Sequence, residues 1–88
     1  MRTYTVVLVR EQDCGYSVHV PAIPGCHTQG DTVAEALYMA QDAIAGMLAV
    51  MEEDGEVAPS DVSAVTLDTA AEVLVYKLPI REEVALAA

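Results

Sequence analysis

The sequence predicts an α+β fold in which one antiparallel-rich sheet carries one long helix on one of its faces. Two stretches with strand composition, residues 3–10 and 15–20, come first along the chain. Helical periodicity begins near residue 32, and another β-rich stretch follows at residues 72–78. With a short third strand before the helix, the order is β-β-β-α-β, which is typical of the α+β class.

The first two strands differ in how they expose their faces. Residues 3–10 (TYTVVLVR) are β-branched and aromatic, with apolar side chains on both faces, so we expect both faces to be covered. Residues 15–20 (GYSVHV) alternate, which places Ser17 and His19 on a solvated face. The polar turn between the two stretches predicts an antiparallel hairpin.

The stretch between the second strand and the helix contains clear boundary signals. Pro21 and Pro24 end the second strand because proline donates no hydrogen bond to a sheet ladder. Residues 26–29 are long enough for a short third strand. Thr32 and Glu35 match a capping box, in which the threonine oxygen accepts the backbone N–H three residues on and the glutamate reaches back to the cap.

The helix is expected to run to about Asp54 and to end at Gly55, with Pro59 preventing continuation. Its buried stripe is predicted to consist of Val33, Leu37, Ala40, Ile44, Leu48 and Met51. Four apolar side chains lie off this stripe. They predict an interface between copies, in a homodimer or higher homo-oligomer, formed by Tyr38, Met39, Met47 and Val50.

The remainder of the chain offers two candidates for the last strand, residues 62–67 and 72–78. We favour the second because it is longer, and we expect Pro79 to close it. Residues 81–88 (REEVALAA) are expected to be a tail or a short terminal helix. The length of 88 residues fits one domain over residues 1–88.

The charge of the chain excludes one large class of partner. Four basic residues stand against fourteen acidic ones, for a net charge of −10. Nucleic-acid binding depends on Lys and Arg that neutralise phosphates, so direct binding to DNA or RNA is not expected. The N-terminus lacks the apolar core of a signal peptide, and no apolar run approaches the length of a membrane span. We therefore expect a cytoplasmic protein without membrane association.

Catalytic and metal-binding readings of the sequence find little support. Two-metal nuclease chemistry needs clustered carboxylates, and residues 3–9 contain none. Cys26 and His27 are adjacent, and Cys14 and His19 are too far apart for the paired spacing of a zinc site. A reactive thiol needs an electropositive setting, which this acidic chain does not provide. We predict no enzyme activity, no cofactor and no metal.

The span from residue 3 to residue 55 contains four motifs in a fixed order. They are a Gly-Tyr-x-Val strand, a Pro-x-x-Pro-Gly-Cys turn, a Gly-Asp-Thr helix start with an acid in the first turn, and an Ala-rich helix. In this sequence they consist of Gly15, Tyr16 and Val18; Pro21, Pro24, Gly25 and Cys26; Gly30, Asp31, Thr32 and Glu35; and Ala36, Ala40 and Ala43. In this ordered combination, the span resembles the HicB-type antitoxin domain.

This resemblance implies a partial RNase H-like fold and an antitoxin that masks a small basic RNA-cleaving toxin of the HicA type. Family members often add a C-terminal DNA-binding segment, and with ten residues after Leu78 we do not expect one here. The surfaces expected to bind a partner are the sheet, through Ser17 and His19, and the acidic helix end, through Glu52, Glu53, Asp54 and Glu56.

The antitoxin role is the leading hypothesis. The second is an orphan HicB-like domain without a toxin, acting as a homo-oligomeric scaffold or as a small-ligand-binding domain, and a third is a degenerate nuclease. The acidic run at the helix end also has a simpler interpretation, since most such runs are solvated surface.

Overall fold

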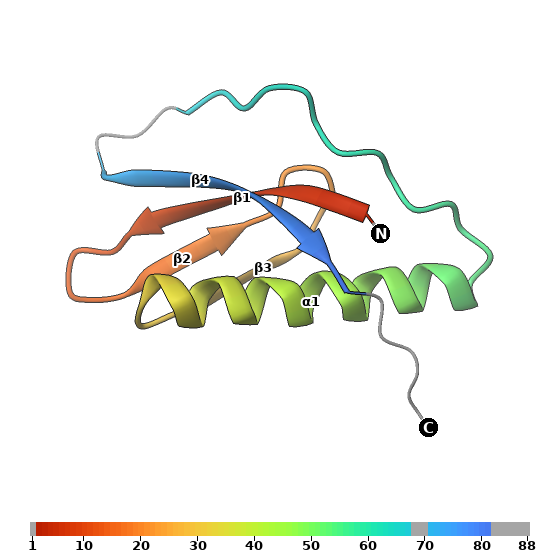
Figure 1. The fold of residues 1–88 in the computed structure, drawn as a ribbon, viewed down its shortest axis with the longest axis horizontal. Helices are drawn as coiled ribbons and strands as arrows, with labels where there is room; N and C mark the ends of the chain where they lie inside the picture. Colours follow the sequence, from red (N-terminus) through yellow and green to blue (C-terminus); the bar gives the residue numbers. More distant parts are fainter. Residues whose placement is uncertain (1, 68–70, 82–88) are drawn as a thin grey trace.

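The computed structural model describes residues 2–67 and 71–81 and confirms the predicted order of elements. These residues form four strands and one long helix, which are labelled in Figure 1. They are β1 (Arg2–Arg10), β2 (Tyr16–His19), β3 (His27–Gly30), α1 (Val33–Glu53) and β4 (Val73–Ile80). The fold is α+β, with all four strands in one sheet and α1 on one of its faces.

The sheet has the strand order β3-β2-β1-β4, and every neighbouring pair is antiparallel. The direction of β4 follows from the segment that precedes it. After α1, residues 54–67 run back along the sheet in the direction of the start of β4 (Figure 1). Because of this return, β4 starts beside the end of β1, with Val73 opposite Val9 and Ile80 opposite Arg2.

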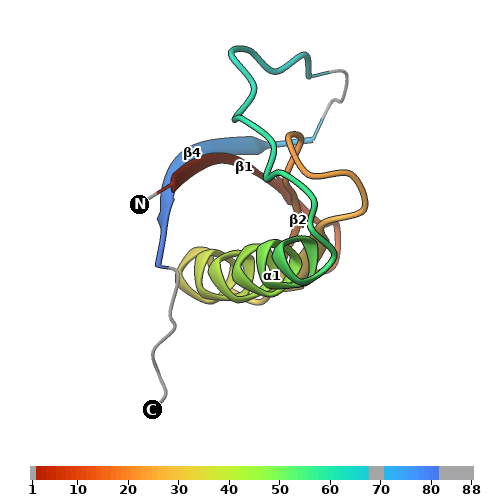
Figure 2. The ribbon, with the colours of Figure 1, turned by 90° about the vertical axis from the view of Figure 1, so that its right-hand side faces the viewer.

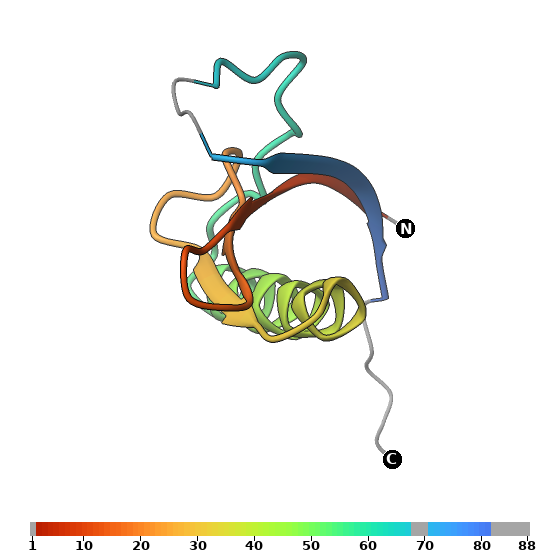
Figure 3. The ribbon, with the colours of Figure 1, turned by 90° about the vertical axis from the view of Figure 1, so that its left-hand side faces the viewer.

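The core lies between α1 and the concave face of the sheet, which curves around one side of the helix (Figures 2 and 3). On the sheet side, the fully buried residues include Tyr4, Val6, Leu8 and Val18. The helix contributes the small residues Ala36 and Ala40 and the larger Ile44 and Leu48. Of the predicted stripe, Val33, Leu37 and Met51 are half-buried, and Ala36 is a core residue that the pattern missed.

The turn from β3 into α1 contains the predicted cap with one difference. The Glu35 backbone N–H donates to Thr32 Oγ1 at 3.0 Å, as expected for an N-cap threonine. The Glu35 carboxylate, however, accepts from the backbone N–H of Asp31 at 2.7 Å and not from that of Thr32. Glu35 therefore satisfies a donor one residue earlier than the usual capping box does.

Gly30 lies so close to α1 that no side chain fits at this position. A Cβ atom there would lie 2.5 Å from the backbone nitrogen of Ala36 and 2.6 Å from its Cα atom. Glycine at residue 30 and alanine at residue 36 thus allow the end of β3 to contact the first turn of the helix directly. This contact sets the distance between the two layers at that end of the molecule.

Three expectations for the C-terminal third need comment. Residues 62–67, the less favoured candidate for the last strand, form no strand and cross the sheet as an irregular segment. Pro79 does not close β4 but lies inside it, opposite Thr3. The expected tail or terminal helix covers residues 81–88, of which residues 82–88 lie outside the described residues.

The irregular segment after α1 is fixed to the outer face of the sheet by Asp61. The backbone N–H and the hydroxyl of Thr5 each donate to the Asp61 carboxylate at 2.8 Å. Lys77 Nζ lies 2.8 Å from Asp61 Oδ2 and 2.6 Å from Thr5 Oγ1. Pairing of β1 with β2 begins only at Val7, so Asp61 supplies an acceptor to β1 where β2 is not paired. Both faces of β1 are therefore covered, as predicted.

The Asp61 contacts predict an acid-sensitive contribution to stability. Burial opposes ionisation of Asp61, but hydrogen bonds from Lys77, Thr5 and the Val62 N–H outweigh it and lower its pKa from 3.8 to about 2. A depressed carboxyl pKa stabilises the folded state above the unfolded pKa, and this stabilisation is lost as the pH falls toward 2. We expect Asp61→Asn to cost about 1–2 kcal/mol at neutral pH.

Urea denaturation across pH measures this contribution. The difference in unfolding free energy between wild type and Asp61→Asn should shrink as the pH falls from 4 toward 2. Glu53→Gln is the matched control, since it removes an exposed carboxylate at the negative end of the helix and should be neutral or slightly stabilising. Equal effects of the two substitutions at neutral pH would show that the Asp61 contacts contribute nothing.

The length and composition of α1 depart from one sequence expectation. Among the described residues, this helix alone is long and apolar enough to cross a membrane on those two criteria, whereas no apolar run of that kind was expected. One such helix is weak evidence of a membrane span, because the core helices of soluble proteins meet the same two criteria. In this fold α1 packs Ile44 and Leu48 against the sheet.

Candidate partner-binding surfaces

The C-terminal end of α1 and the residues after it form an exposed acidic cluster. Its members are Glu52, Glu53, Asp54 and Glu56, the four acidic residues that the sequence singled out. The last turn of the helix contains no basic residue, although the carbonyl end of a helix favours cations. Gly55, with φ of +76°, lets the chain turn back at this point and brings Glu56 next to the helix end.

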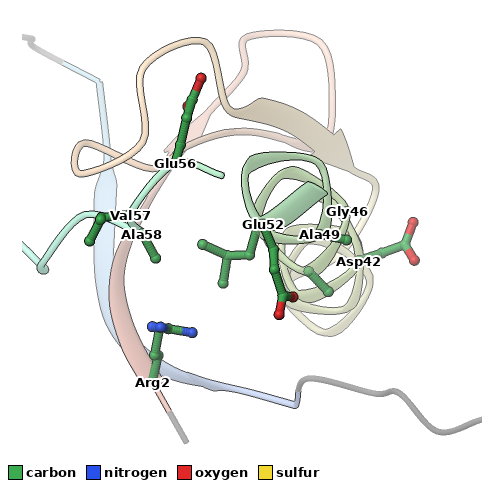
Figure 4. A pocket seen from close by; sticks show the side chains of 10 residues that line it. Arg2, Asp42, Gly46, Ala49, Glu52, Glu56, Val57 and Ala58 are labelled. Carbon is green, nitrogen blue, oxygen red and sulfur yellow. The ribbon is translucent and has the colours of Figure 1, made fainter. Parts of the chain in front are cut away.

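A groove of about 740 Å³ lies beside this cluster, between α1, the start of β1 and residues 56–58. Figure 4 shows Arg2 extending from β1 toward the helix, with Glu52 on the helix side of the hollow. The apolar part of the lining consists of Ala45, Leu48, Ala49, Val57 and Ala58. The groove thus combines an apolar wall with charged groups of both signs at its opening.

The second predicted surface lies on the outer face of the sheet, opposite the helix. His19 is exposed there, next to Val7 of β1 and opposite His27 of β3. Ser17 is half-buried, and its hydroxyl donates to Glu11 Oε2 at 2.6 Å. His19 is therefore accessible to a partner, whereas the Ser17 hydroxyl already has one within the chain.

The structure does not bring the two predicted surfaces together. Ser17 lines a separate polar hollow of about 540 Å³ beside the β1–β2 turn, with Glu11, Asp13 and Asp31. That turn and the C-terminal end of α1 lie at opposite ends of the molecule (Figure 1). A partner that contacts both surfaces has to span the long dimension of the protein.

The predicted oligomer interface on α1 separates into two kinds of side chain. Tyr38 is 70% exposed and Val50 is 55% exposed, which makes them the two large apolar residues that α1 presents to solvent. Met39 and Met47 are half-buried, and Met47 packs against the core. The role of these four residues in self-association stays a prediction.

The two cysteine thiols lie in different environments. Burial raises the pKa of the Cys26 thiol above its ordinary 9.0, which disfavours the reactive thiolate. Cys14 is exposed and free. Within residues 2–67 and 71–81, no group of three or more His, Cys, Asp or Glu side chains is arranged to hold a metal ion.

Sequence reasoning missed several residues of these surfaces. Arg2, Val57 and Ala58 line the groove only because the chain after α1 turns back toward β1, and no local signal reports that return. His27 also belongs to the outer face, beside His19. The alternation of side chains along the two strands could have predicted that His19 and His27 are neighbours, since the β2–β3 hairpin places them opposite each other on one face.

Comparison with known proteins identifies the family. Residues 4–80 match the model of the HicB-like antitoxins of bacterial toxin–antitoxin systems. Over 56 residues the chain is 45% identical to antitoxin HicB 1 of Photorhabdus laumondii, a match that covers 64% of this chain and 36% of that protein. The chain thus spans about a third of that relative's length.

Two solved structures share the fold. The N-terminal domain of the Burkholderia pseudomallei antitoxin HicB has a TM-score of 0.66 at 24% identity, covering 89% of this chain and 99% of that one. A chain of a toxin–antitoxin complex from Streptococcus pneumoniae has a TM-score of 0.72 at 17% identity, covering 98% and 78% of the two chains. With the family match extending from β1 to the end of β4, the chain belongs to the HicB-like antitoxins of bacterial toxin–antitoxin systems.

Proposed function

We propose that this antitoxin neutralises a small basic RNA-cleaving toxin of the HicA type by binding to it and covering its RNA-binding face. The observation that carries the proposal is the distribution of charge around α1. Residues 31–56 contain seven acidic residues and no Lys or Arg: Asp31, Glu35, Asp42, Glu52, Glu53, Asp54 and Glu56. A surface of one sign attracts a partner of the other sign and raises the rate of association.

The acidic cluster at the helix end is the first contact in this proposal. Four carboxylates at the negative end of a helix are unfavourable for the helix itself, and a role in binding accounts for their presence. The adjoining groove supplies apolar surface for the stem of a Lys or Arg side chain, whose charged end would then reach Glu52. RNA-binding surfaces are rich in such side chains.

The mechanism is occlusion and not catalysis. An RNA-binding face neutralised by carboxylates loses its attraction for phosphate, and the bulk of the antitoxin excludes the RNA from the catalytic residues. His19, exposed on the outer face of the sheet, belongs to a second contact region in this scheme. Because α1 covers the other face of the sheet, a toxin that contacts both regions has to wrap around one side of the domain.

A second function, a homo-oligomeric scaffold without a toxin partner, is favoured by one observation. Tyr38 and Val50 expose apolar surface on α1 that the fold itself leaves uncovered. Self-association through this surface would explain it without any toxin.

Binding to a small basic RNA-cleaving toxin of the HicA type, sought in the reading frames next to the gene for this chain, tests the first function. Mixing the two purified proteins is expected to give a complex of defined stoichiometry and to stop RNA cleavage. The absence of a complex with a folded, active toxin would favour the scaffold function instead.

A further inference from the structure

β4 forms an open edge of the sheet that is suited to pairing with another strand. It lies at the end of the strand order, and within residues 2–67 and 71–81 no segment pairs with its outer side. The opposite edge, β3, has four residues and turns into α1 at Gly30, whereas β4 has eight. A long exposed edge presents unpaired backbone groups that a further strand can bind.

The usual protections of an edge strand are weak in β4. A lysine on an edge commonly prevents pairing by projecting into solvent along it. Here Lys77 turns back over the sheet, where its Nζ contacts Thr5 and Asp61 at 2.6 and 2.8 Å. Pro79 removes one donor near the end of the strand and leaves residues 73–78 available. Val75, in the middle of this stretch, is 48% exposed.

The distribution of charge indicates which partner this edge accepts. All four basic residues of the chain lie on β1 and β4 or directly after β4: Arg2, Arg10, Lys77 and Arg81. Neither strand contains an acidic residue. A second copy also carries a net charge of −10, so the acidic helix side repels it most and this edge repels it least. A basic toxin is instead attracted most strongly to the acidic helix side.

We infer that β4 pairs antiparallel with β4 of a second copy, which joins two four-stranded sheets into one. A two-fold axis next to Val75 would place this residue opposite itself and bury its exposed side chain against its symmetry mate. Lys77 would then lie opposite Val73 of the second copy, so no like charges face each other. The acidic ends of both helices stay free in this dimer, and the pairing does not depend on the existence of a toxin.

Sedimentation equilibrium of two matched variants distinguishes this edge from the exposed face of α1. Val75→Glu places two carboxylates opposite each other at the axis and should weaken dimerisation on the order of tenfold or more. Val50→Glu makes the same change on the helix, at a similarly exposed residue, and should leave the dimer intact. The wild-type dimer should strengthen with added salt, because salt screens the repulsion between two acidic chains.

Disulfide cross-linking tests the register without relying on a disrupted variant. In a background lacking the exposed Cys14, Val75→Cys should form a covalent dimer, since Cα atoms of directly opposed antiparallel residues lie about 4.5–5.5 Å apart. Val73→Cys, two residues away on the same face, should form no covalent dimer, because this residue would lie opposite Lys77 of the second copy. A monomeric wild type at micromolar concentration, loss of the dimer in Val50→Glu alone, or equal cross-linking of both cysteine variants would each overturn the inference.

Discussion

Replacing Gly30 by alanine is expected to destabilise the protein by about 3 kcal/mol or more. The added methyl group would lie 2.5 Å from the backbone nitrogen of Ala36 and 2.9 Å from the backbone carbon of Glu35. Backbone atoms of a capped helix do not rotate away as a side chain would, so β3 and α1 have to move apart. A chain of this size has a total stability of only about 4–13 kcal/mol, so this loss is a large part of it.

Gly46→Ala provides the control for this substitution. Gly46 lies inside α1, is exposed and has no neighbouring atom within 4 Å of an added Cβ atom. The same chemical change should therefore stabilise the helix by about 0.5–1 kcal/mol. Thermal unfolding followed by circular dichroism compares the two. Similar melting temperatures for Gly30→Ala and wild type would show that the contact between β3 and the helix start is looser than described.

The second large effect concerns toxin binding. Reversing two charges at the helix end, with Glu52→Lys and Glu56→Lys in one variant, should slow association with a basic toxin by about 10- to 100-fold at low salt. The reason is that electrostatic attraction raises the frequency of productive encounters. Stopped-flow or surface-based association kinetics measures the rate, and the difference from wild type should diminish as salt is added.

The control for charge reversal changes the net charge by the same amount at the other end of the molecule. Asp13→Lys with Glu72→Lys alters two exposed residues near the β1–β2 turn and the start of β4. If proximity to the toxin matters, this variant should bind nearly as fast as wild type. Equal slowing by both double variants would indicate that net charge alone governs binding and that the helix end is no specific site.

The parts of the fold that could be predicted are those with local causes. Thr32 and Glu35 define the helix start, and alternation in residues 15–20 separates Val18 from His19. The direction of β4 has no such cause, because it depends on where the long segment after α1 crosses the sheet. The contacts of Asp61 with Thr5 and Lys77, which fix that segment, join residues 56 and 16 positions apart in the sequence.

The candidate surfaces were predictable to a similar degree. The acidic cluster at the helix end is contiguous in sequence, so its exposure followed from the position where the helix stops. The engagement of Ser17 by Glu11 was not visible, since the β1–β2 turn has to fold before the two side chains meet. The groove is likewise a product of tertiary structure, built from three segments that only the return of the chain brings together.

The most direct test of the antitoxin role is a titration of RNA cleavage. A HicA-type toxin is held at a fixed concentration well above the dissociation constant of its complex with the antitoxin, and cleavage of a labelled RNA is followed as the antitoxin is added. We expect cleavage to fall linearly and to stop at a fixed ratio of the two proteins. Val75→Glu, whose dimerisation is expected to be weakened, should inhibit as well as wild type. Undiminished cleavage in the presence of excess folded antitoxin would contradict the account.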